Sequence, residues 1–271
     1  MQAVVAIVVA YIGAIALKRL KQKKEPVRNP VQSAHNSIFC ELQGGLGNQM
    51  FQVATGYAVA QRTGKKLTIG SGPTCTRPSY WDSWLHSFAR HKVDYKTPPA
   101  NMSRGWNKYE ESQFHYKPVP STANWMVGYF QSSKFFQGAL DELRILFRLP
   151  GNVLDQVQAK YDSLLASMNL DKCAVVHIRR SDYVKFPRIH GILSPEYFQG
   201  AIARAKQVNP NIDQLIVFSD DLPWCKTQSF LHGSIFVDEP NDVFALWLMS
   251  QFRNFVMSNS SFSWWAVMLG T

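Results

Sequence analysis

A short apolar run that ends in a packet of one histidine, two arginines and an aspartate constrains the fold of this chain more than any other feature. The run spans residues 173–176 and has the composition of a buried strand, which is predicted at 173–178. Arg179, Arg180 and Asp182 follow it, and because side chains alternate along an extended chain, the two arginines cannot both point into the core. Guanidinium groups match the oxygens of phosphate. The packet predicts a diphosphate-binding site; the alternative is a surface cluster in which Arg180 pairs with Asp182.

The second half of the sequence alternates apolar runs with helical patterns, which predicts a parallel sheet covered by helices. Polar residues follow two more of the predicted strands: Asp220 and Asp221 follow one, and the run 258–261 follows another. Because the carboxyl ends of parallel strands lie at one edge of a sheet, we expect the three polar groups to form one ligand site. The predicted strands are 173–178, 215–218, 235–237 and 255–257, and the predicted helices are 153–166, 194–208, 242–251 and 262–269.

A glycine-rich turn in the first half lies between a predicted strand at 38–42 and a predicted helix that ends at Gly64. The turn contains Gly45 and Asn48, at a helix start where backbone N–H groups can meet an anion or a sugar hydroxyl. It matches neither the P-loop nor the G-x-G-x-x-G fingerprint. A tight turn without a ligand is the alternative interpretation.

The remaining patterns predict two α/β domains after an N-terminal segment. A strand is expected at 66–69, whereas 71–123 has little periodicity and indicates an irregular insertion. A strand at 125–129 and a helix at 140–147 follow, and Pro150 with Gly151 marks a boundary. We therefore expect a segment at 1–36, a first domain at 37–150 and a second domain at 151–271.

The N-terminal segment predicts a single-pass membrane anchor. Residues 1–17 carry no charged side chain, and 3–17 are almost wholly apolar. The uncharged stretch 1–17 is near the lower length limit for spanning a bilayer, and a basic run at 18–24 follows it. By the positive-inside rule this run stays in the cytosol, so the domains beyond a polar linker at 25–36 are expected on the cytosolic side. A cleaved signal peptide and a domain in the Golgi lumen are the alternatives.

Charge and cysteine content argue against two other kinds of site. Six basic residues and one acid lie within the first 36 residues and account for half of the net charge of +10. The other half falls short of a nucleic-acid footprint, so no nucleic-acid partner is expected. No metal site is expected either, because the cysteines form no C-x-x-C pair and no cluster with histidine. They are Cys40, Cys75, Cys173 and Cys225.

Five segments, in order along residues 38–270, resemble one known family. They are 44–52, 128–132, 177–182, 218–221 and 258–265. Through them the chain resembles the α-1,2-fucosyltransferases of glycosyltransferase family 11. The resemblance implies an α/β fold of the GT-B type with two Rossmann-like domains, the first on the acceptor side. It also implies GDP-fucose as donor, inversion at C1, a galactose-containing glycan as acceptor and no metal.

Catalytic roles follow from the chemistry of this transfer. Arg179 is expected to bind the β-phosphate, where negative charge grows as GDP leaves, and Arg180 to order Asp182 or the acceptor side. Asp182 is the first candidate for the general base that takes the acceptor's proton. Glu196, at the start of the next helix, is the second, although an acid in a first helical turn is also explained by the helix dipole.

Donor-binding roles are implied by the resemblance. His177 and Asp242 are expected to contact guanine, and Ser260 or Ser261 to contact the phosphates. Two alternatives stay open: a fucosyltransferase with another acceptor or linkage, and a non-catalytic protein that binds sugar nucleotides or glycans. The other residues expected to bind the donor are Arg179, Asp220, Asp221, Asn259, Gly45 and Asn48.

Overall fold

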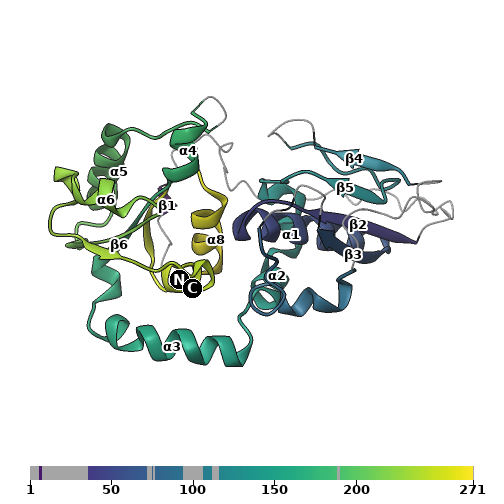
Figure 1. The fold of residues 1–271 in the computed structure, drawn as a ribbon, viewed down its shortest axis with the longest axis horizontal. Helices are drawn as coiled ribbons and strands as arrows, with labels where there is room; N and C mark the ends of the chain where they lie inside the picture. Colours follow the sequence, from purple (N-terminus) through teal and green to yellow (C-terminus); the bar gives the residue numbers. More distant parts are fainter. Residues whose placement is uncertain are drawn as a thin grey trace. The chain divides into compact units, whose positions relative to one another are not determined.

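The computed structural model describes residues 6–7, 36–71, 75, 77–93, 106–111, 116–187 and 190–270. These residues form two compact α/β units, which are described separately (Figure 1). The first unit comprises the described residues of Ala10–Ser79 and Phe88–Leu143. The second comprises those of Met1–Val9, Tyr80–Ser87 and Arg144–Thr271.

The first unit contains a parallel four-stranded sheet in the order β3-β2-β5-β4. Helix α1 follows β2 and ends at Gly64, whose φ of 68° is the left-handed conformation that glycine adopts without strain. Gly56 lets α1 approach β2 and β3, because a Cβ atom there would lie 3.1 Å from both Cys40 and Leu67. The elements are β2 (Ser37–Leu42), α1 (Leu46–Thr63), β3 (Lys66–Ser71), β4 (Lys108–Glu110), β5 (Trp125–Val127) and the short helices η3 (Ser133–Phe135) and η4 (Gln137–Ala139).

The second unit contains a parallel five-stranded sheet in the order β1-β9-β6-β7-β8. Helices α2 (Leu140–Leu146) and η1 (His86–His91) each begin in one unit and end in the other. The strands are β1 (Ala6–Ile7), β6 (Cys173–Ile178), β7 (Gln214–Ser219), β8 (Ile235–Val237) and β9 (Asn254–Val256). The helices are α3 (Gly151–Ala166), η5 (Leu170–Lys172), α4 (Ser181–Lys185), α5 (Pro195–Val208), α6 (Leu222–Lys226), η6 (Ser229–Leu231), α7 (Asp242–Ser250) and α8 (Ser261–Leu269).

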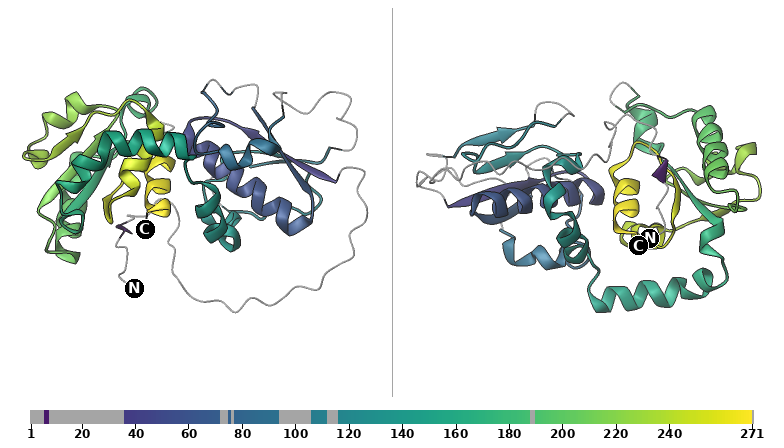
Figure 2. Two further views of the ribbon diagram at one scale, coloured as in Figure 1. Left: turned by 90° about the horizontal axis from the view of Figure 1, so that it is seen from below. Right: turned by 180° about the vertical axis from the view of Figure 1, so that it is seen from behind.

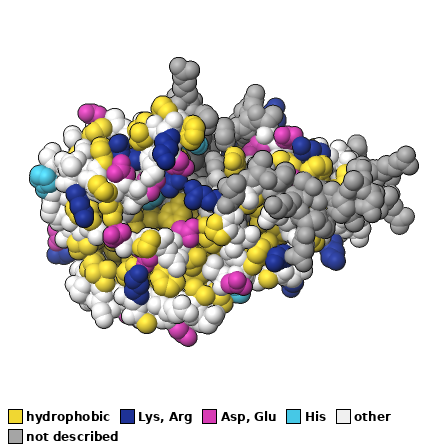
Figure 3. All heavy atoms as spheres, in the orientation of Figure 1, with side chains coloured by type: hydrophobic (Ala, Val, Ile, Leu, Met, Phe, Trp, Pro, Cys, Tyr) yellow, Lys and Arg dark blue, Asp and Glu magenta, His cyan; other side chains and the backbone are white. Residues whose placement is uncertain are grey.

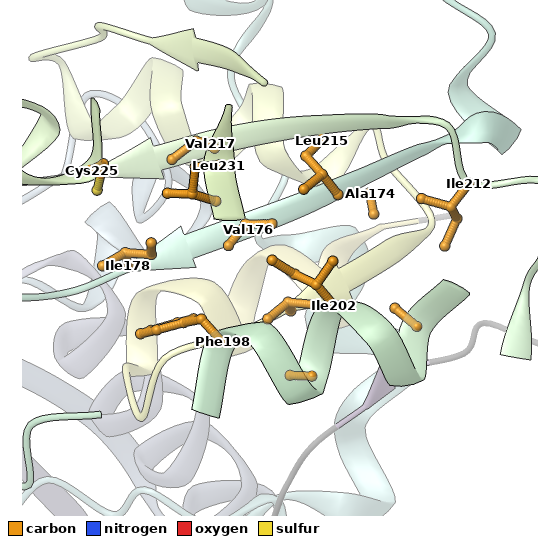
Figure 4. Packing of buried hydrophobic residues seen from close by; sticks show 13 residues of the cluster. Ala174, Val176, Ile178, Phe198, Ile202, Ile212, Leu215, Val217, Cys225 and Leu231 are labelled. Carbon is orange, nitrogen blue, oxygen red and sulfur yellow. The ribbon is translucent and has the colours of Figure 1, made fainter. Parts of the chain in front are cut away.

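Strand β6 is the centre of the second unit. All six of its residues are buried, as expected for a parallel strand with neighbours on both edges and helices on both faces of its sheet. Figures 1 and 2 show the sheet between α5 on one face and α8 on the other. Phe198 and Ile202 of α5 pack against Val176 of β6 (Figure 4), and each fully buried side chain of this size contributes about 1.5–3 kcal/mol to stability.

Most of the predicted strands and helices are present, together with elements that were not expected. Strand β4 and the short helix η1 lie inside the stretch expected to be irregular, and α4 and α6 follow β6 and β7 where no helix was expected. The domain boundary at Pro150–Gly151 stays a prediction. In the structure, residues 80–87 of the expected first domain belong to the compact unit that contains β6.

The predicted anchor at 3–17 lies outside the described residues except for Ala6 and Ile7. These two form β1, which pairs in parallel with Phe255 and Val256 of β9. Within the described ranges, none of the helices combines the length and the apolar character needed to cross a membrane. The membrane anchor therefore stays a prediction.

Candidate active site

Three neighbouring strands deliver the polar residues that the sequence placed at one sheet edge. Strands β9, β6 and β7 are adjacent and parallel, so the residues that follow them lie at the same edge. Ser258 follows β9, Arg179 follows β6 and Asp220 follows β7. A hydrogen bond joins Ser258 to the backbone N–H of Arg179, and an ion pair joins the Arg179 side chain to Asp220, which confirms the expectation that these strand ends come together. On the face shown in Figure 3, acidic and basic side chains of this unit are interspersed.

Arg179 lies between two carboxylates. Its Nη2 is 2.8 Å from Oδ1 of Asp182, and its Nη1 is 3.0 Å from Oδ2 of Asp220. Burial alone would raise the pKa of Asp182, but the hydrogen bond and charge of Arg179 hold it below its ordinary value. The arginine side chain is 30% exposed, so one edge of a fixed, charged donor group remains accessible to a ligand.

Asp220 organises the backbone that carries these groups. Its carboxylate accepts hydrogen bonds from the backbone N–H of Arg180 at 2.8 Å and of Ser181 at 3.2 Å. Its own carbonyl accepts from the Ser181 hydroxyl at 2.8 Å. The carboxylate thus covers the amino end of α4, where a negative charge is favourable, while it also fixes Arg179.

Arg180 is held by a separate set of partners. Its Nε donates to Asp221 Oδ2 at 3.0 Å, and its guanidinium lies 3.8 Å from the centre of the Trp224 ring, a cation–π contact. Asp221 also accepts from the Trp224 backbone N–H at 3.2 Å and so caps α6. The pairing of Arg180 with Asp182 that the surface-cluster alternative requires is wrong: Asp182 pairs with Arg179, and Arg180 pairs with Asp221.

Ser258 joins β9 to β6 at the site; the sequence placed it in the polar run at this sheet edge but gave it no role of its own. Its hydroxyl donates to the carbonyl of His177 at 2.9 Å and accepts from the backbone N–H of Arg179 at 2.9 Å. Its backbone N–H also donates to the His177 carbonyl at 3.0 Å. A serine directly after an apolar strand was the available signal, because a hydroxyl that is buried there needs partners.

His177 is a buried, neutral imidazole at the end of β6. Burial, and secondarily the charge of Arg179, lowers its pKa to about 4. Among the described residues its Nδ1 is buried without a hydrogen-bond partner, which is unusual for a buried polar atom. The ring lies 5.8 Å from that of Phe262 in α8. This arrangement is compatible with the predicted contact to a nucleobase, and the contact stays a prediction.

The run after β9 caps α8 with Ser260, which precedes Ser261, the first residue of the helix. The Ser260 hydroxyl accepts from the Phe262 backbone N–H at 3.3 Å. Asn259 connects to the segment after α4: its Nδ2 donates to the Gly191 carbonyl at 2.9 Å. The predicted phosphate contacts of Asn259, Ser260 and Ser261 stay predictions.

Two acids predicted to take part lie at helix starts. Glu196, in the first turn of α5, is fully exposed, and a hydrogen bond with Ser194 holds its pKa below the ordinary value. Asp242 is the first residue of α7 and accepts a hydrogen bond from the Tyr80 hydroxyl. Within the part of the chain that the structure describes, neither acid forms a hydrogen bond with Arg179, Asp182 or Asp220.

Gly45 and Asn48 lie in the first unit. Gly44 has a φ of 72°, and a Cβ atom on it would lie 2.6 Å from Asn48 Nδ2, so glycine is required there. The side-chain Oδ1 of Asn48 accepts a hydrogen bond from Gln131 Nε2 at 2.8 Å. Gln52 donates to the Gly128 carbonyl at 3.1 Å. The matched segments 44–52 and 128–132 therefore touch each other, which gives them a structural role, and their contact with a donor stays a prediction.

No group of three histidine, cysteine, aspartate or glutamate side chains in the described ranges is arranged to hold a metal ion. Three of the cysteines, Cys40, Cys173 and Cys225, are buried and unpaired, and Cys75 is partly exposed and also free. Burial raises the pKa of the Cys173 and Cys225 thiols, which keeps them protonated.

Comparisons with known proteins place the chain. An alpha-1,2-colitosyltransferase of Escherichia coli is 29% identical over 266 residues, which cover 86% of this chain and 87% of the relative. A galactoside alpha-(1,2)-fucosyltransferase 2 of Oryctolagus cuniculus is 25% identical over 83% of this chain and 65% of its own length. The sequence model of the family described as "Glycosyl transferase family 11" matches residues 8–271.

Solved structures agree on the fold. Fucosyltransferase NodZ from Bradyrhizobium superposes with a TM-score of 0.51 at 14% identity, over 87% of this chain and 93% of that one. A mutant of Arabidopsis thaliana FUT1 in complex with GDP superposes with a TM-score of 0.52 at 14% identity, over 92% of this chain and 71% of that one. These likenesses support the GT-B-like fold of two α/β units. By the family match over nearly its whole length, the chain belongs to glycosyltransferase family 11.

Proposed function

We propose that this protein transfers L-fucose from GDP-fucose to the 2-hydroxyl of a galactose-type acceptor, with inversion at C1. The observation that carries the proposal is the fixed guanidinium of Arg179 at the carboxyl end of β6, 2.8 Å from Asp182 and 3.0 Å from Asp220. Family membership supports the class of reaction. The activities for which two relatives are named, α-1,2-colitosyl and α-(1,2)-fucosyl transfer, support the linkage.

Arg179 stabilises the leaving group. As the bond between C1 of fucose and the β-phosphate oxygen breaks, positive charge develops on the sugar ring and negative charge on GDP. A guanidinium that is already fixed requires no reorganisation as this charge grows, which is how preorganised donors lower a barrier. The accessible edge of the guanidinium donates to the β-phosphate while its other N–H groups stay paired with Asp182 and Asp220. The guanidinium therefore keeps the same orientation during the transfer.

We call Arg179 with its two partners, Asp182 and Asp220, the clamp. Arg180 supports this clamp and is not part of it. Its contacts with Asp221 and Trp224 fix the residue that joins β6 to α4. Through the backbone it helps to orient the Arg179 side chain. Asp220 and Asp221, which were expected to bind the donor, are instead proposed to hold Arg179 and Arg180 in place. The phosphate contacts of Ser260, Ser261 and Asn259 at the start of α8 complete the proposed donor site.

The acceptor hydroxyl loses its proton as it attacks C1. Asp182 remains the first candidate for the base, because it is ionised and adjacent to the clamp. Its lowered pKa makes it a weaker base, so the ion pair also supports a second role, orientation of Arg179. Glu196 is the alternative base. The transfer is proposed to proceed without a metal, since the clamp supplies positive charge to the diphosphate.

Colitose transfer is the second candidate, favoured by the similarity to the alpha-1,2-colitosyltransferase of Escherichia coli. Colitose is fucose without its 3-hydroxyl, so the two donors differ by one hydrogen-bonding group. A site built to bind a sugar hydroxyl rejects an analogue that lacks it by a factor of about 10⁴–10⁵. The ratio of kcat/KM for GDP-fucose and GDP-colitose therefore separates the two proposals.

The location of the catalytic units is also a proposal. The apolar stretch at 3–17 and the basic run at 18–24 support an N-terminal anchor with the catalytic units in the cytosol. The alternative, a lumenal domain, is tested by glycosylation as described in the Discussion.

The function is tested by incubating the purified protein with GDP-fucose and a panel of sugars that includes free galactose and β-galactosides. We expect GDP release that depends on the galactoside and a product one fucose heavier by mass spectrometry. Release of GDP at the same rate without any acceptor, and no fucosylated product, would show hydrolysis or simple binding and would contradict the proposal.

A further inference from the structure

We propose that Tyr80 and Trp84 are positioning residues that hold the start of α7 so that Asp242 can select guanine over other purines. The inference rests on the proposed use of GDP-fucose and on the predicted contact between Asp242 and the base. It assigns a function to residues 80–87, which lie inside the stretch expected to be an irregular insertion. We call these residues the 80–87 turn.

Two side chains of the 80–87 turn bond to the first two residues of α7. The Tyr80 hydroxyl donates to Oδ2 of Asp242, and the indole Nε1 of Trp84 donates to the carbonyl of Val243 at 3.2 Å. Tyr80 is 7% exposed and Trp84 is 3% exposed. One bond fixes the carboxylate and the other fixes the backbone beneath it, so the turn determines where the acid of α7 points.

The 80–87 turn is rigid enough for this role because its own backbone is tied together. The carbonyl of Tyr80 accepts from the backbone N–H of Ser83 at 3.1 Å and of Leu85 at 2.9 Å. The Ser83 carbonyl in turn accepts from the backbone N–H of His86 at 3.0 Å. A phenol on such a closed turn is a preorganised donor, since little side-chain freedom remains to be lost when it bonds.

The other side of the α7 start is fixed independently. Asn241 caps the helix by accepting from the Val243 backbone N–H at 3.0 Å, and its own N–H donates to Glu239 Oε1 at 2.9 Å. Lys160 of α3 lies 2.7 Å from Glu239 Oε2, which the Tyr161 hydroxyl also contacts. The start of α7 is thus held on one side by the 80–87 turn and on the other by Asn241 and Glu239. Among the described residues, Tyr80 alone contacts the carboxylate of Asp242.

The chemistry of the base gives this arrangement a purpose. Guanine presents a ring N1–H and an exocyclic amine on one edge, and a carboxylate accepts both. A carboxylate has about four acceptor positions, so the Tyr80 hydroxyl leaves room for two more donors. Hypoxanthine has the N1–H but lacks the amine. A carboxylate that is correctly oriented therefore favours GDP over IDP, and one that can rotate loses most of that preference.

The experiment measures GDP and IDP affinities by calorimetry for the full chain and its variants. Wild-type protein should bind GDP more tightly than IDP by about tenfold to 100-fold, the value of one hydrogen bond to a charged group. Tyr80→Phe keeps the ring and removes the donor; we expect GDP affinity to fall by about tenfold and IDP affinity by less, so the ratio narrows. Trp84→Phe should act in the same direction. Tyr109→Phe, which removes a hydroxyl bonded to the Lys117 carbonyl in the other unit, should leave the ratio unchanged.

Asp242→Asn separates the possible failures. If Asp242→Asn narrows the ratio of GDP affinity to IDP affinity while Tyr80→Phe and Trp84→Phe do not, Asp242 reads the base without help from the 80–87 turn. The proposed use of GDP-fucose is then retained and the positioning inference is overturned. If it leaves the ratio unchanged, Asp242 does not read the base and the inference is also overturned. Wild-type protein that binds neither nucleotide would contradict the proposed function itself. A melting curve for each variant ensures that only folded protein is compared.

Discussion

Arg179→Lys is the substitution that examines the proposed clamp most closely. Lysine keeps the positive charge and loses the planar fork of donors. In the structure the fork spans two acids: Nη1 bonds to Asp220 at 3.0 Å and Nη2 to Asp182 at 2.8 Å. A single ammonium cannot hold both of these carboxylates in the same geometry and also present a fixed donor to the β-phosphate.

The expected loss is kinetic rather than structural. Removing one preorganised donor to developing negative charge costs a factor of about 10²–10³ in rate, or about 2.7–4 kcal/mol of transition-state stabilisation. The ion pairs that are lost are partly exposed, with side chains 30% and 41% accessible for Arg179 and Asp182. Such pairs stabilise a fold by about 1 kcal/mol or less, so the melting temperature should change little.

The assay is single-turnover transfer from GDP-fucose with saturating galactoside, together with calorimetry of GDP binding. Arg253→Lys is the matched control: Arg253 pairs with Asp171 at 2.5 Å and precedes β9, at the opposite sheet edge from the site. We expect Arg253→Lys to keep the wild-type rate. An Arg179→Lys variant that is folded and retains more than about half of the wild-type rate, instead of losing about 10²-fold, would refute the clamp.

Four further outcomes are expected. If Asp182 is the base, Asp182→Asn should bind GDP within about threefold of wild type while turnover falls by about 10²-fold or more. If GDP affinity and turnover are both lost, Asp182 orients Arg179 and Glu196 becomes the first candidate for the base. Because the pKa of Asp182 is lowered, its pair with Arg179 stabilises the fold above the ordinary carboxyl pKa and is lost as pH falls through the lowered value, so the difference in stability between wild type and variant should vanish in acid. EDTA should leave transfer unchanged, and loss on chelation that Mn²⁺ or Mg²⁺ restores would overturn the metal-free mechanism. The sequons at Asn101 and Asn259 should stay unmodified if the catalytic units face the cytosol, and a glycosidase-sensitive mass shift on expressed protein would place them in the lumen.

The sheet edge could be predicted because its signal is local. The run that becomes β6 is apolar at nearly every position and ends abruptly at Arg179, and the same change of character marks the ends of β7 and β9. The helices with clear signals were also found: α5 begins with the cap Ser194 and a proline at its first position. Parallel topology then follows from the alternation of strand and helix.

The features that could not be predicted depend on contacts distant in sequence. Helix α4 has five residues, too few for a periodic pattern, and its start is fixed by Asp220 from another strand. The choice of Asp182 as the partner of Arg179 depends on the geometry of that short helix. Strand β4 is Lys108–Glu110, a polar tripeptide that forms a strand only because it pairs beside β5. Tyr80 and Trp84 lie in a stretch without periodicity, and their packing against α7 is tertiary.

The most direct test of the proposed function is the linkage and anomeric configuration of the product. The purified protein is given GDP-fucose, in which fucose is β-linked, and a β-galactoside, and the isolated product is analysed by two-dimensional NMR. We predict an α-configured fucosyl residue whose anomeric proton shows a through-bond correlation, across the glycosidic oxygen, to C2 of galactose. A β-configured product, a fucose attached to another position, or no fucosylated product under conditions in which GDP binds would contradict the account.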